Sequence, residues 1–439
     1  MPFTSLGLAP ELVRAVAEEG YEQPTPIQLE AIPLALAGRD LIGSAQTGTG
    51  KTAAFMLPIL QRLSHGKIKH ALRALVLVPT RELAEQVLQS ARAYGRHLDV
   101  SAAAVYGGVG MEPQTRALKH GADIVVATPG RLIDLLDRQA TTLDAIEITV
   151  LDEADHMADL GFLPAVTRIL DATPASGQRM LFSATLDRGV GRLVTAYLSD
   201  PALHAVAPES IDGGTTEHSV LVLSAEDKVP VAAEIASRPA RTLFFVRTKH
   251  GADRLARQFG RAGVDAAAIH GNLNQNQRQR ALAGFAAGSP RVLVATNVAA
   301  RGIHVDDVEL VVHFDPPNDH KDYLHRSGRT ARAGASGMVV ALAEHAQVRD
   351  IEQLHDAAGV TPATHHVQAG HHVVRQLATS GTPVSPPPTA RTPVPPTAAG
   401  RSAGARSPGA RSADARGSGA PRARRPGHPR RSSRARSLS

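Results

Sequence analysis

The sequence predicts an α/β protein with two tandem domains, each a parallel sheet covered by helices on both faces, followed by a disordered basic C-terminal tail. Two observations predict the domains. Short β-branched runs alternate with Ala-, Leu- and Arg-rich stretches of helical period, and these runs fall into two sets. A third observation predicts the tail, because the chain from Gly381 onward consists almost wholly of Pro, Ala, Arg, Ser, Gly and Thr.

The first domain, at residues 1–205, begins with a short strand at 40–43 and a helix at 53–62. A helix is also predicted at 81–94. Alternation of this kind is typical of parallel strands joined by crossover helices, so we expect a sheet buried on both faces. The other strands of this domain are predicted at 75–78, 124–126, 148–151 and 180–182.

The second domain, at residues 218–375, has a similar pattern, with a helix at 252–260. The stretch Pro201–Thr216 has turn residues and no clear period, so we place a linker at 206–217 and the tail at 376–439. The strands of the second domain are predicted at 243–246, 266–269, 292–294, 310–313 and 338–341.

Composition excludes several classes of protein. The chain of 439 residues contains no Cys, so it has no disulfide framework, thiolate zinc site or catalytic thiol. No apolar run approaches the ~18 residues that span a bilayer, and we expect a soluble cytoplasmic protein without a membrane partner. The pairs His365-His366 and His371-His372 raise the alternative of a metal site. Because neither Cys nor a neighbouring acid completes a ligand set, we assign them to the junction with the tail.

The tail accounts for the net positive charge of the chain. Residues 381–439 contain 12 Arg, no Lys and one acid, Asp414, which gives +11 and leaves −4 for the rest of a chain whose formal net charge is +7. A flexible basic arm suits phosphate polymers, because each neutralised phosphate releases counterions. A solubilising tail without a specific partner is the alternative. If the arm binds nucleic acid, deleting the residues after Gly381 weakens that binding and flattens its salt dependence.

Polar residues cluster directly after the predicted strands. Ligands of open α/β sheets bind outside the carboxyl ends of the strands, so one edge of each domain is predicted to hold the chemistry. The segments are 46–52, 79–81, 128–131, 152–155, 183–185 and 296–302.

The first segment has the pattern of a phosphate-binding loop. Its glycines let backbone N–H groups face phosphate oxygens at a helix N-terminus, Lys51 reaches the β- and γ-phosphates, and the Thr52 hydroxyl ligates Mg²⁺. The strict pattern has Gly where this chain has Ala45, and a Gly-rich turn with a fortuitous Lys is the alternative. The predicted ATP-binding residues here are Ala45, Gln46, Thr47, Gly48, Thr49, Gly50, Lys51 and Thr52.

Two acids follow the apolar strand at 148–151. Asp152 is predicted to hold Mg²⁺ together with Thr52, and Glu153 to orient or deprotonate the attacking water. A solvated surface pair is the alternative. Arg329 and Arg332 supply cations for charge that develops on the γ-phosphate, although they equally fit an exposed helix face. Since these Arg lie in the second domain, we expect ATP to be hydrolysed between the domains.

In order and spacing, these residues resemble the DEAD-box family of ATP-dependent RNA helicases in helicase superfamily two. Asp152-Glu-Ala-Asp155 is the tetrapeptide that names the family, and the likeness extends from Phe3 to about Gly334. The resemblance implies two RecA-like domains, with ATP and Mg²⁺ as cofactors. It also implies a Q motif at 3–28, in which Gln28 reads adenine, Phe3 stacks on it and Tyr21 contributes to the ATP site.

The resemblance further implies RNA contacts to the sugar-phosphate chain without base readout, although each motif alone could be an ordinary loop. Ser183, Thr185, Asp155 and His325 are implied to couple the ATP site to RNA. The implied RNA-binding residues are Pro79, Thr80, Arg81, Gly108, Thr128, Gly130, Arg131, Thr248, Gln275, Arg278 and Thr296.

Two residues depart from the family pattern. Asn297 and His304 stand where the family usually has Asp. His304 carries no fixed negative charge toward the ribose, so we predict a nucleotide affinity that depends on pH near 6 to 7, within the ordinary range of histidine, and that His304→Asp makes independent of pH.

The function predicted from these residues and the resemblance is that of an ATP-dependent RNA helicase. It couples ATP hydrolysis to local duplex unwinding and to remodelling of ribonucleoproteins, with ribosomal or mRNA particles as candidate partners. A DNA helicase is one alternative, and the scarcity of aromatic residues, at 3%, argues against base-stacking platforms for either polymer. A clamp that ATP closes on RNA, with unwinding incidental, is the other.

Overall fold

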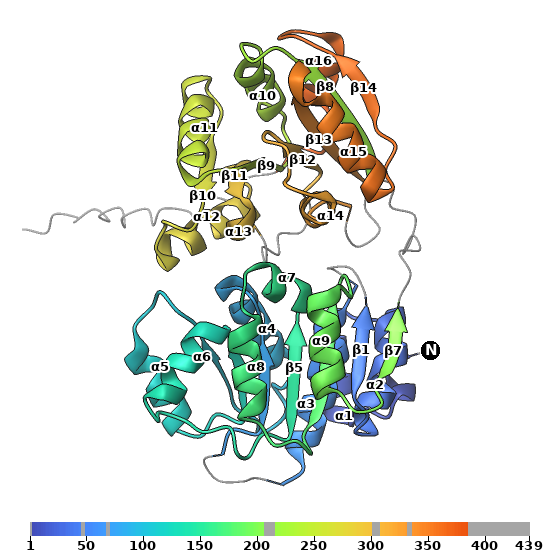
Figure 1. Cartoon of the computed structure of the whole chain (residues 1–439), viewed down its shortest axis with the longest axis vertical. Coiled ribbons are helices and arrows are strands. Elements are labelled where there is room, and N and C mark those ends of the chain that lie inside the picture. The colour runs from blue at the N-terminus through green and yellow to red at the C-terminus, as the bar shows by residue number, and fades with distance from the viewer. Residues whose placement is uncertain are drawn as a thin grey trace, which may run out of the picture. The chain divides into compact units, whose positions relative to one another are not determined.

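The computed structural model describes residues 2–44, 49–66, 71–205, 216–300, 308–331 and 336–384. They form two seven-stranded sheets, one in each half of the chain, and every strand pair is parallel (Figure 1). The two-domain α/β prediction is therefore confirmed.

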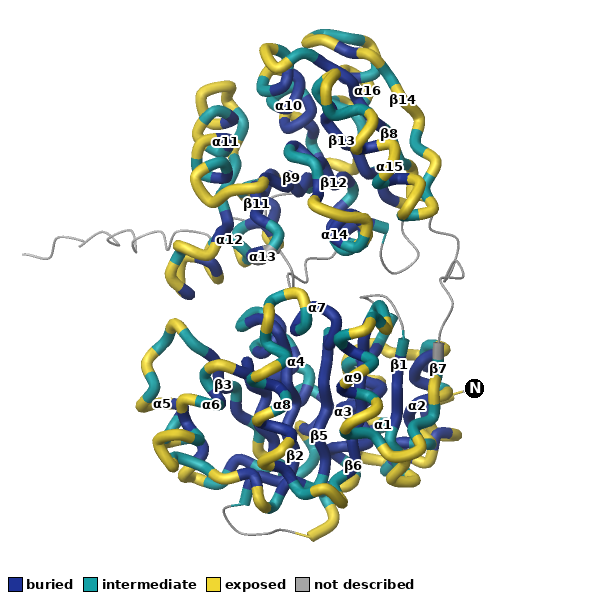
Figure 2. Tube along the Cα trace, viewed as in Figure 1, coloured by how far each residue is buried: buried dark blue, intermediate teal, exposed yellow. Residues whose placement is uncertain are grey.

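The first sheet has the strand order β3-β4-β2-β5-β6-β1-β7. Its central strands are buried along their whole length (Figure 2), because helices cover both faces and leave no face for polar side chains. The strands are β1 Leu41–Ser44, β2 Ala74–Leu77, β3 Ala102–Val105, β4 Ile124–Ala127, β5 Ile148–Asp152, β6 Gln178–Ser183 and β7 Ala202–Ala205.

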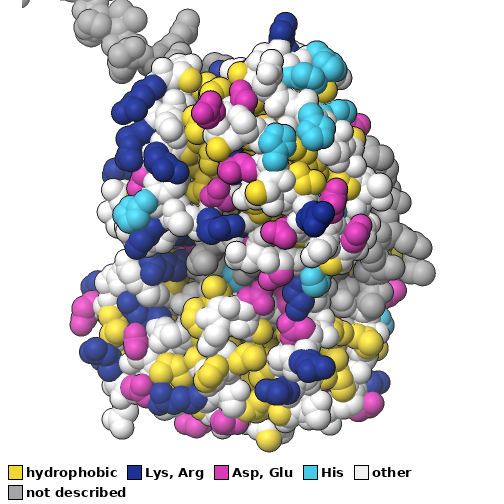
Figure 3. Space-filling model, turned by 45° about the horizontal axis from the view of Figure 1, so that its top comes forward, with side chains coloured by type: hydrophobic (Ala, Val, Ile, Leu, Met, Phe, Trp, Pro, Cys, Tyr) yellow, Lys and Arg dark blue, Asp and Glu magenta, His cyan; other side chains and the backbone are white. Residues whose placement is uncertain are grey.

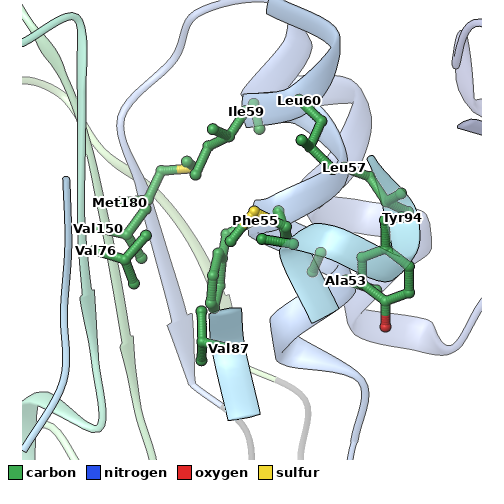
Figure 4. Close-up of a cluster of buried hydrophobic side chains, with 14 of the residues drawn as sticks. Ala53, Phe55, Leu57, Ile59, Leu60, Val76, Val87, Tyr94, Val150 and Met180 are labelled. Carbon is green, nitrogen blue, oxygen red and sulfur yellow. The ribbon is translucent and has the colours of Figure 1, made fainter. Parts of the chain in front are cut away.

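Two apolar cores lie on the two faces of this sheet. On one face, Phe55 of α3 packs against Phe182 with ring centroids 5.3 Å apart, among side chains of α3, α4 and the strands (Figure 4). On the other face, Leu135, Ile169 and Val190 of α6, α8 and α9 form the second core. The helices of this half are η1 Phe3–Leu6, α1 Pro10–Glu18, α2 Pro26–Leu36, α3 Lys51–Ser64, α4 Arg81–Tyr94, α5 Met111–Lys119, α6 Pro129–Asp137, α7 Ala154–Asp159, α8 Leu163–Asp171 and α9 Arg188–Tyr197.

The second sheet has the order β10-β11-β9-β12-β13-β8-β14. Its strands are β8 Thr216–Leu223, β9 Thr242–Val246, β10 Ala266–Ile269, β11 Val292–Thr296, β12 Leu310–His313, β13 Gly337–Glu344 and β14 Ala363–His366. Its helices are α10 Lys228–Ala236, α11 Lys249–Arg261, α12 Gln275–Ala286, α13 Asn297–Ala300, α14 His320–Ser327, η3 His345–Gln347, α15 Val348–Ala358 and α16 His372–Thr379.

The two sheets share one topology. When the strands of each half are ranked in chain order, both sheets read third, fourth, second, fifth, sixth, first, seventh. All strands of a sheet therefore end at one edge, and each loop at that edge of the first half has a counterpart in the second half.

The ends of the second half differ from the sequence prediction. β8 begins at Thr216, inside the predicted linker, and α16 extends past the predicted end at 375. The chain stays in the fold beyond this helix, because Thr382 N donates to Glu309 Oε1 at 3.1 Å and Arg238 Nε donates to the Ser380 carbonyl at 3.3 Å. The rest of the predicted tail lies outside the described residues.

The histidine pairs assigned to the junction belong to these same end elements. His365 and His366 lie on the edge strand β14, and His371 caps α16. Among the residues that the structure describes, no helix is long and apolar enough to cross a bilayer.

Candidate functional site

Residues of the predicted Q motif hold the end of the phosphate-binding loop. Gln28 is 3% exposed, and its amide links two backbones: its Oε1 accepts from Thr25 N at 3.0 Å, and its Nε2 donates to the Gly50 carbonyl at 3.1 Å. The Thr25 hydroxyl donates to the Thr49 carbonyl at 2.8 Å. The residue predicted to read adenine thus also fixes the loop that precedes Lys51.

Gly50 is required at its position. It adopts φ 90°, which L side chains rarely adopt, and a Cβ there would lie 2.8 Å from Thr25 Oγ1 and overlap Gln28 Nε2. Lys51 is the first residue of α3 and is buried, and Thr52 follows it. Ala45, Gln46, Thr47 and Gly48 lie outside the described residues.

The two aromatic residues predicted for the ATP site differ in exposure. Phe3 is 3% exposed and packs in the first core. Tyr21 is 44% exposed, and its ring meets that of Tyr94 edge-on with centroids 6.2 Å apart. Tyr21 is therefore accessible to a ligand, whereas most of Phe3 contacts protein.

Asp152 and Glu153 lie side by side and ionise differently. Asp152, the last residue of β5, is 3% exposed, and burial raises its pKa to about 7 against the opposing charge of Lys51. Burial also opposes ionisation of Glu153. The hydrogen bond from His156, whose Nδ1 lies 3.2 Å from Glu153 Oε2, and the charges of Arg329 and Lys51 outweigh burial and lower the Glu153 pKa to about 2.

Of the two Arg predicted to stabilise charge on the γ-phosphate, Arg329 lies within the described residues. It is 4% exposed, and its charge acts on Glu153 of the first half. Arg332 and His304 lie outside the described residues.

Asp155 joins the remaining predicted coupling residues. Its Oδ2 accepts from Thr185 N at 2.9 Å and from the Thr185 hydroxyl at 3.1 Å, and its backbone N donates to Ser183 Oγ at 3.2 Å. His325 Nε2, from α14 of the second half, lies 3.9 Å from the same Oδ2. One buried carboxylate therefore contacts both the loop after β6 and the second half.

Several predicted RNA-binding residues of the first half shape their own loops. Thr80 Oγ1 accepts from Leu83 N at 3.2 Å and caps α4. Arg81 packs so closely on Gly108, at φ 82°, that a Cβ there would overlap its guanidinium. Arg131 donates to the Val109 carbonyl at 3.2 Å. The others lie on the same edge: Pro79 follows β2, and Thr128 and Gly130 stand at the start of α6.

Two residues of the second half that are predicted to bind RNA contact the first half in this structure. Arg278 Nε donates to Glu82 Oε1 at 2.7 Å and Gln275 Nε2 to the same oxygen at 3.4 Å, and both residues are buried. Thr248 is exposed and caps α11 by accepting from Gly251 N at 3.0 Å, and Thr296 ends β11.

Asn297, one of the departures from the family pattern, bonds within the second half. Its Nδ2 donates to Asp322 Oδ2 at 2.5 Å, and Arg326 Nη2 donates to the same oxygen at 3.0 Å. The Asn297 amide therefore donates a hydrogen bond to the buried carboxylate of Asp322.

Comparisons with known proteins agree with this arrangement. The family model of the DEAD/DEAH box helicase matches residues 25–193, and that of the helicase conserved C-terminal domain matches residues 227–334. The ATP-dependent rRNA helicase RRP3 of Kluyveromyces lactis is 40% identical over 361 residues, which cover 81% of this chain and 74% of the relative. The chain belongs to the DEAD-box family of ATP-dependent RNA helicases.

A second relative and a solved structure extend the comparison. The chain is 38% identical over 378 residues to DEAD-box ATP-dependent RNA helicase 30 of Arabidopsis thaliana, and these cover 82% of this chain but only 63% of the relative's length. The structure of S. cerevisiae Dbp5 bound to RNA and ADP BeF3 superposes with a TM-score of 0.75 at 28% identity, over 86% of this chain and 100% of that chain. The two sheets are those of tandem RecA-like domains.

The shared topology identifies a residue of this DEAD-box protein that the sequence analysis missed. Lys228 is the first residue of α10, which follows β8, as Lys51 is the first residue of α3, which follows β1. Lys228 is buried, donates to Glu344 Oε1 at 3.0 Å and lies 4.0 Å from Asp315 Oδ1. Nothing in the sequence around Lys228 signals that it occupies the position equivalent to Lys51, because no glycine-rich loop precedes it.

Proposed function

We propose that this DEAD-box protein is an RNA-dependent ATPase that hydrolyses ATP between its two halves and grips RNA through the sugar-phosphate backbone. The observation that carries the proposal is the position of Asp155. Its carboxylate accepts two hydrogen bonds from Thr185, beside the ATP site, while His325 of the second half lies 3.9 Å away. A movement of Thr185 in the first half or of His325 in the second half would therefore change the contacts of the same Asp155 carboxylate.

The residues of the ATP site fit a magnesium nucleotide. Mg²⁺ prefers oxygen ligands, and the Asp152 carboxylate with the Thr52 hydroxyl supplies them. The pKa of Asp152 is raised to about 7 because burial disfavours its charge and Lys51 offsets burial only in part. A divalent cation bound beside this carboxyl would stabilise the charged form. When bound, Mg²⁺ would neutralise charge on the β- and γ-phosphates, and Lys51 would bind the same phosphates.

Glu153 and Arg329 are assigned to hydrolysis, with Arg332 as a second cation. Glu153, with a pKa of about 2, is ionised at neutral pH and is a weak base, so it orients the attacking water rather than removing its proton early. Arg329 lies close enough to act on Glu153 and would stabilise charge developing on the γ-phosphate, a role worth roughly 10³ to 10⁵ in rate in related chemistry.

RNA binding is proposed for the loops at the same edge of the two sheets. The bond from Arg278 to Glu82 means that RNA competes with a carboxylate for this guanidinium, so binding exchanges one anion for another. This exchange is a physical reason for RNA to change the contacts between the halves. Ribonucleoprotein remodelling and a cytoplasmic location complete the proposal.

ATPase activity measured with and without RNA tests the proposal. We expect RNA, and not DNA of matched length, to stimulate hydrolysis, and we expect Arg329→Gln to lower the stimulated rate by at least about 10³. Arg349→Gln, at an exposed position on α15, is the matched control and keeps the wild-type rate. Full activity in Arg329→Gln, or equal stimulation by DNA, would overturn the proposal. Strand displacement of a short duplex then separates a helicase from a clamp.

A further inference from the structure

One face of α11 carries only basic side chains. His250, Arg254, Arg257 and Arg261 are spaced by four, three and four residues, which places them on one side of a helix, and all four are exposed. We call these four residues the α11 stripe. At 1.5 Å per residue it is about 16 Å long. Figure 3 shows Lys and Arg side chains gathered along the edge of the molecule where α11 lies.

The charges of the stripe are not balanced within the helix. Asp253 is the one acid of α11; its side chain is 39% exposed, and its Oδ1 lies 2.9 Å from Nε2 of the buried His270, so it bonds to this histidine rather than to an Arg of the stripe. Among the residues that the structure describes, no hydrogen bond or ion pair holds the side chains of Arg254, Arg257 or Arg261. Like charges three or four residues apart repel each other and destabilise a helix. A bound polyanion would remove this repulsion.

The stripe continues directly from a predicted RNA contact. Thr248 caps α11 and lines a cavity of about 220 Å³ at this end of the helix. Its polar lining also includes Arg247, Arg254, Gln258 and one acid, Asp315, which follows β12 and lies 4.0 Å from Lys228 Nζ. Arg254 thus belongs both to the cavity and to the stripe. A strand held at Thr248 can therefore follow the row of guanidinium groups without crossing an acidic side chain of α11.

We propose that the α11 stripe is a second RNA-binding surface, which holds phosphates of the strand next to the segment bound at the ends of the sheets. This proposal rests on the RNA binding proposed above. The stripe contains no Phe, Tyr or Trp, so it offers charge without a stacking surface, and its binding is independent of base sequence. Continuity with Thr248 favours RNA over an acidic protein or an anionic membrane.

Binding of unstructured RNA of two lengths, about 8 and about 30 nucleotides, tests the proposal on the full chain. The variant is the double substitution Arg257→Gln and Arg261→Gln, which leaves Arg254 and the cavity at Thr248 intact. We expect it to bind the long RNA at least about tenfold more weakly and to lower the slope of log affinity against log salt by about 1.4, which is 0.7 for each of two phosphates. Binding of the short RNA and the ATPase rate at saturating short RNA stay at wild-type values.

The matched control removes two exposed Arg elsewhere, at Arg92 and Arg138, and keeps the wild-type length dependence. Equal losses on both RNA lengths, or an unchanged salt slope, would overturn the proposal. So would a loss confined to polyglutamate or to phosphatidylserine vesicles, because it identifies a protein or membrane partner. If RNA fails to stimulate the wild-type ATPase, the proposed function fails instead, whatever the stripe does.

Discussion

Replacing the buried His313 by Phe is expected to make the protein more stable, and increasingly so in acid. His313 is fully buried at the end of β12, with its ring centroid 6.0 Å from that of Phe245 and 5.0 Å from that of Tyr323. Neither of its ring nitrogens has a hydrogen-bond partner among the described residues. A buried polar group without a partner destabilises the fold by about 1 to 3 kcal/mol, and Phe removes both nitrogens while keeping a ring beside Tyr323.

Proton linkage supplies the second part of the effect. Burial holds the pKa of His313 well below its ordinary value of 6.5, and the positive charge of Arg326 lowers it further. Below about pH 6.5 the unfolded chain therefore takes up a proton that the folded chain does not, and the free energy of unfolding falls by up to about 1.4 kcal/mol per pH unit. The stabilisation is fully present above this pH and is lost as the pH falls. His313→Phe removes this part of the loss and leaves the parts due to the nearby His218 and His355, whose pKa values burial also lowers.

Urea denaturation followed by far-UV circular dichroism at about pH 8, 6.5 and 5.5 measures both parts. The difference in unfolding free energy between His313→Phe and wild type should be about 1 to 3 kcal/mol at the highest pH and should grow as the pH falls. His120→Phe, at an exposed position, is the control and keeps the wild-type pH dependence. An unchanged pH dependence in His313→Phe would refute the reasoning. The change of this free-energy difference with pH, unlike its value at a single pH, does not depend on how well the Phe ring packs.

Three further substitutions test the site. Gly50→Ala would overlap Gln28 Nε2 at a φ of 90°, so we expect ATPase activity to fall by about 10² with little change in melting temperature, and normal activity would show that the loop is not fixed in this way. Asp155→Asn removes a charge that both halves contact. Stimulation of the ATPase by RNA should fall at least about tenfold while the affinity for ATP is kept, and loss of ATP binding itself would contradict the coupling role. Lys228→Met removes the cation that pairs with the partly exposed carboxylate of Glu344. We expect it to lower the free energy of unfolding, measured by urea denaturation, by about 1 to 2 kcal/mol, and adding Glu344→Leu should reverse this loss in part.

The strands that could be predicted from the sequence are those whose burial leaves a local pattern. The runs at 148–151 and 292–294 are β-branched and apolar because helices cover both faces of each sheet, and the structure places strands there. β3, with the sequence Ala-Ala-Ala-Val, has no such run and was missed. The end of the second half was placed too early, because the bonds that hold Thr382 reach Glu309, far away in the sequence.

The residues of the candidate site were predictable, but their partners were not. A motif gives the residue type and the strand that it follows, which is why Asp155 and Thr185 lie together as expected. It does not show which acid lies opposite a given Arg. Arg278 was predicted to contact RNA, and only the folded chain shows that Glu82 is bonded to it. Long-range ion pairs of this kind depend on the packing of two domains and leave no periodic signal.

The shared topology explains why the two halves do different chemistry. In each half, a Lys opens the helix that follows the first strand, so both halves begin with the same cation at the same edge. Before Lys51, residues 45–50 include two glycines, whose backbone can turn its N–H groups toward phosphate. Before Lys228, residues 224–227 include none, and this shorter connection offers no such cradle.

Internal carboxylates complete the difference. Glu344 ends β13, the neighbour of β8, and Asp315 follows β12, the next strand along the sheet; both lie beside Lys228 and balance its charge, as an anionic ligand would. A second nucleotide would have to displace both acids from the buried Lys228, and the connection before this lysine has no glycine to form a phosphate cradle. We therefore expect the second half to contribute to the first half's nucleotide site rather than to bind a nucleotide of its own. Arg329, whose charge acts on Glu153, is the residue proposed for this contribution, which would need the two halves together.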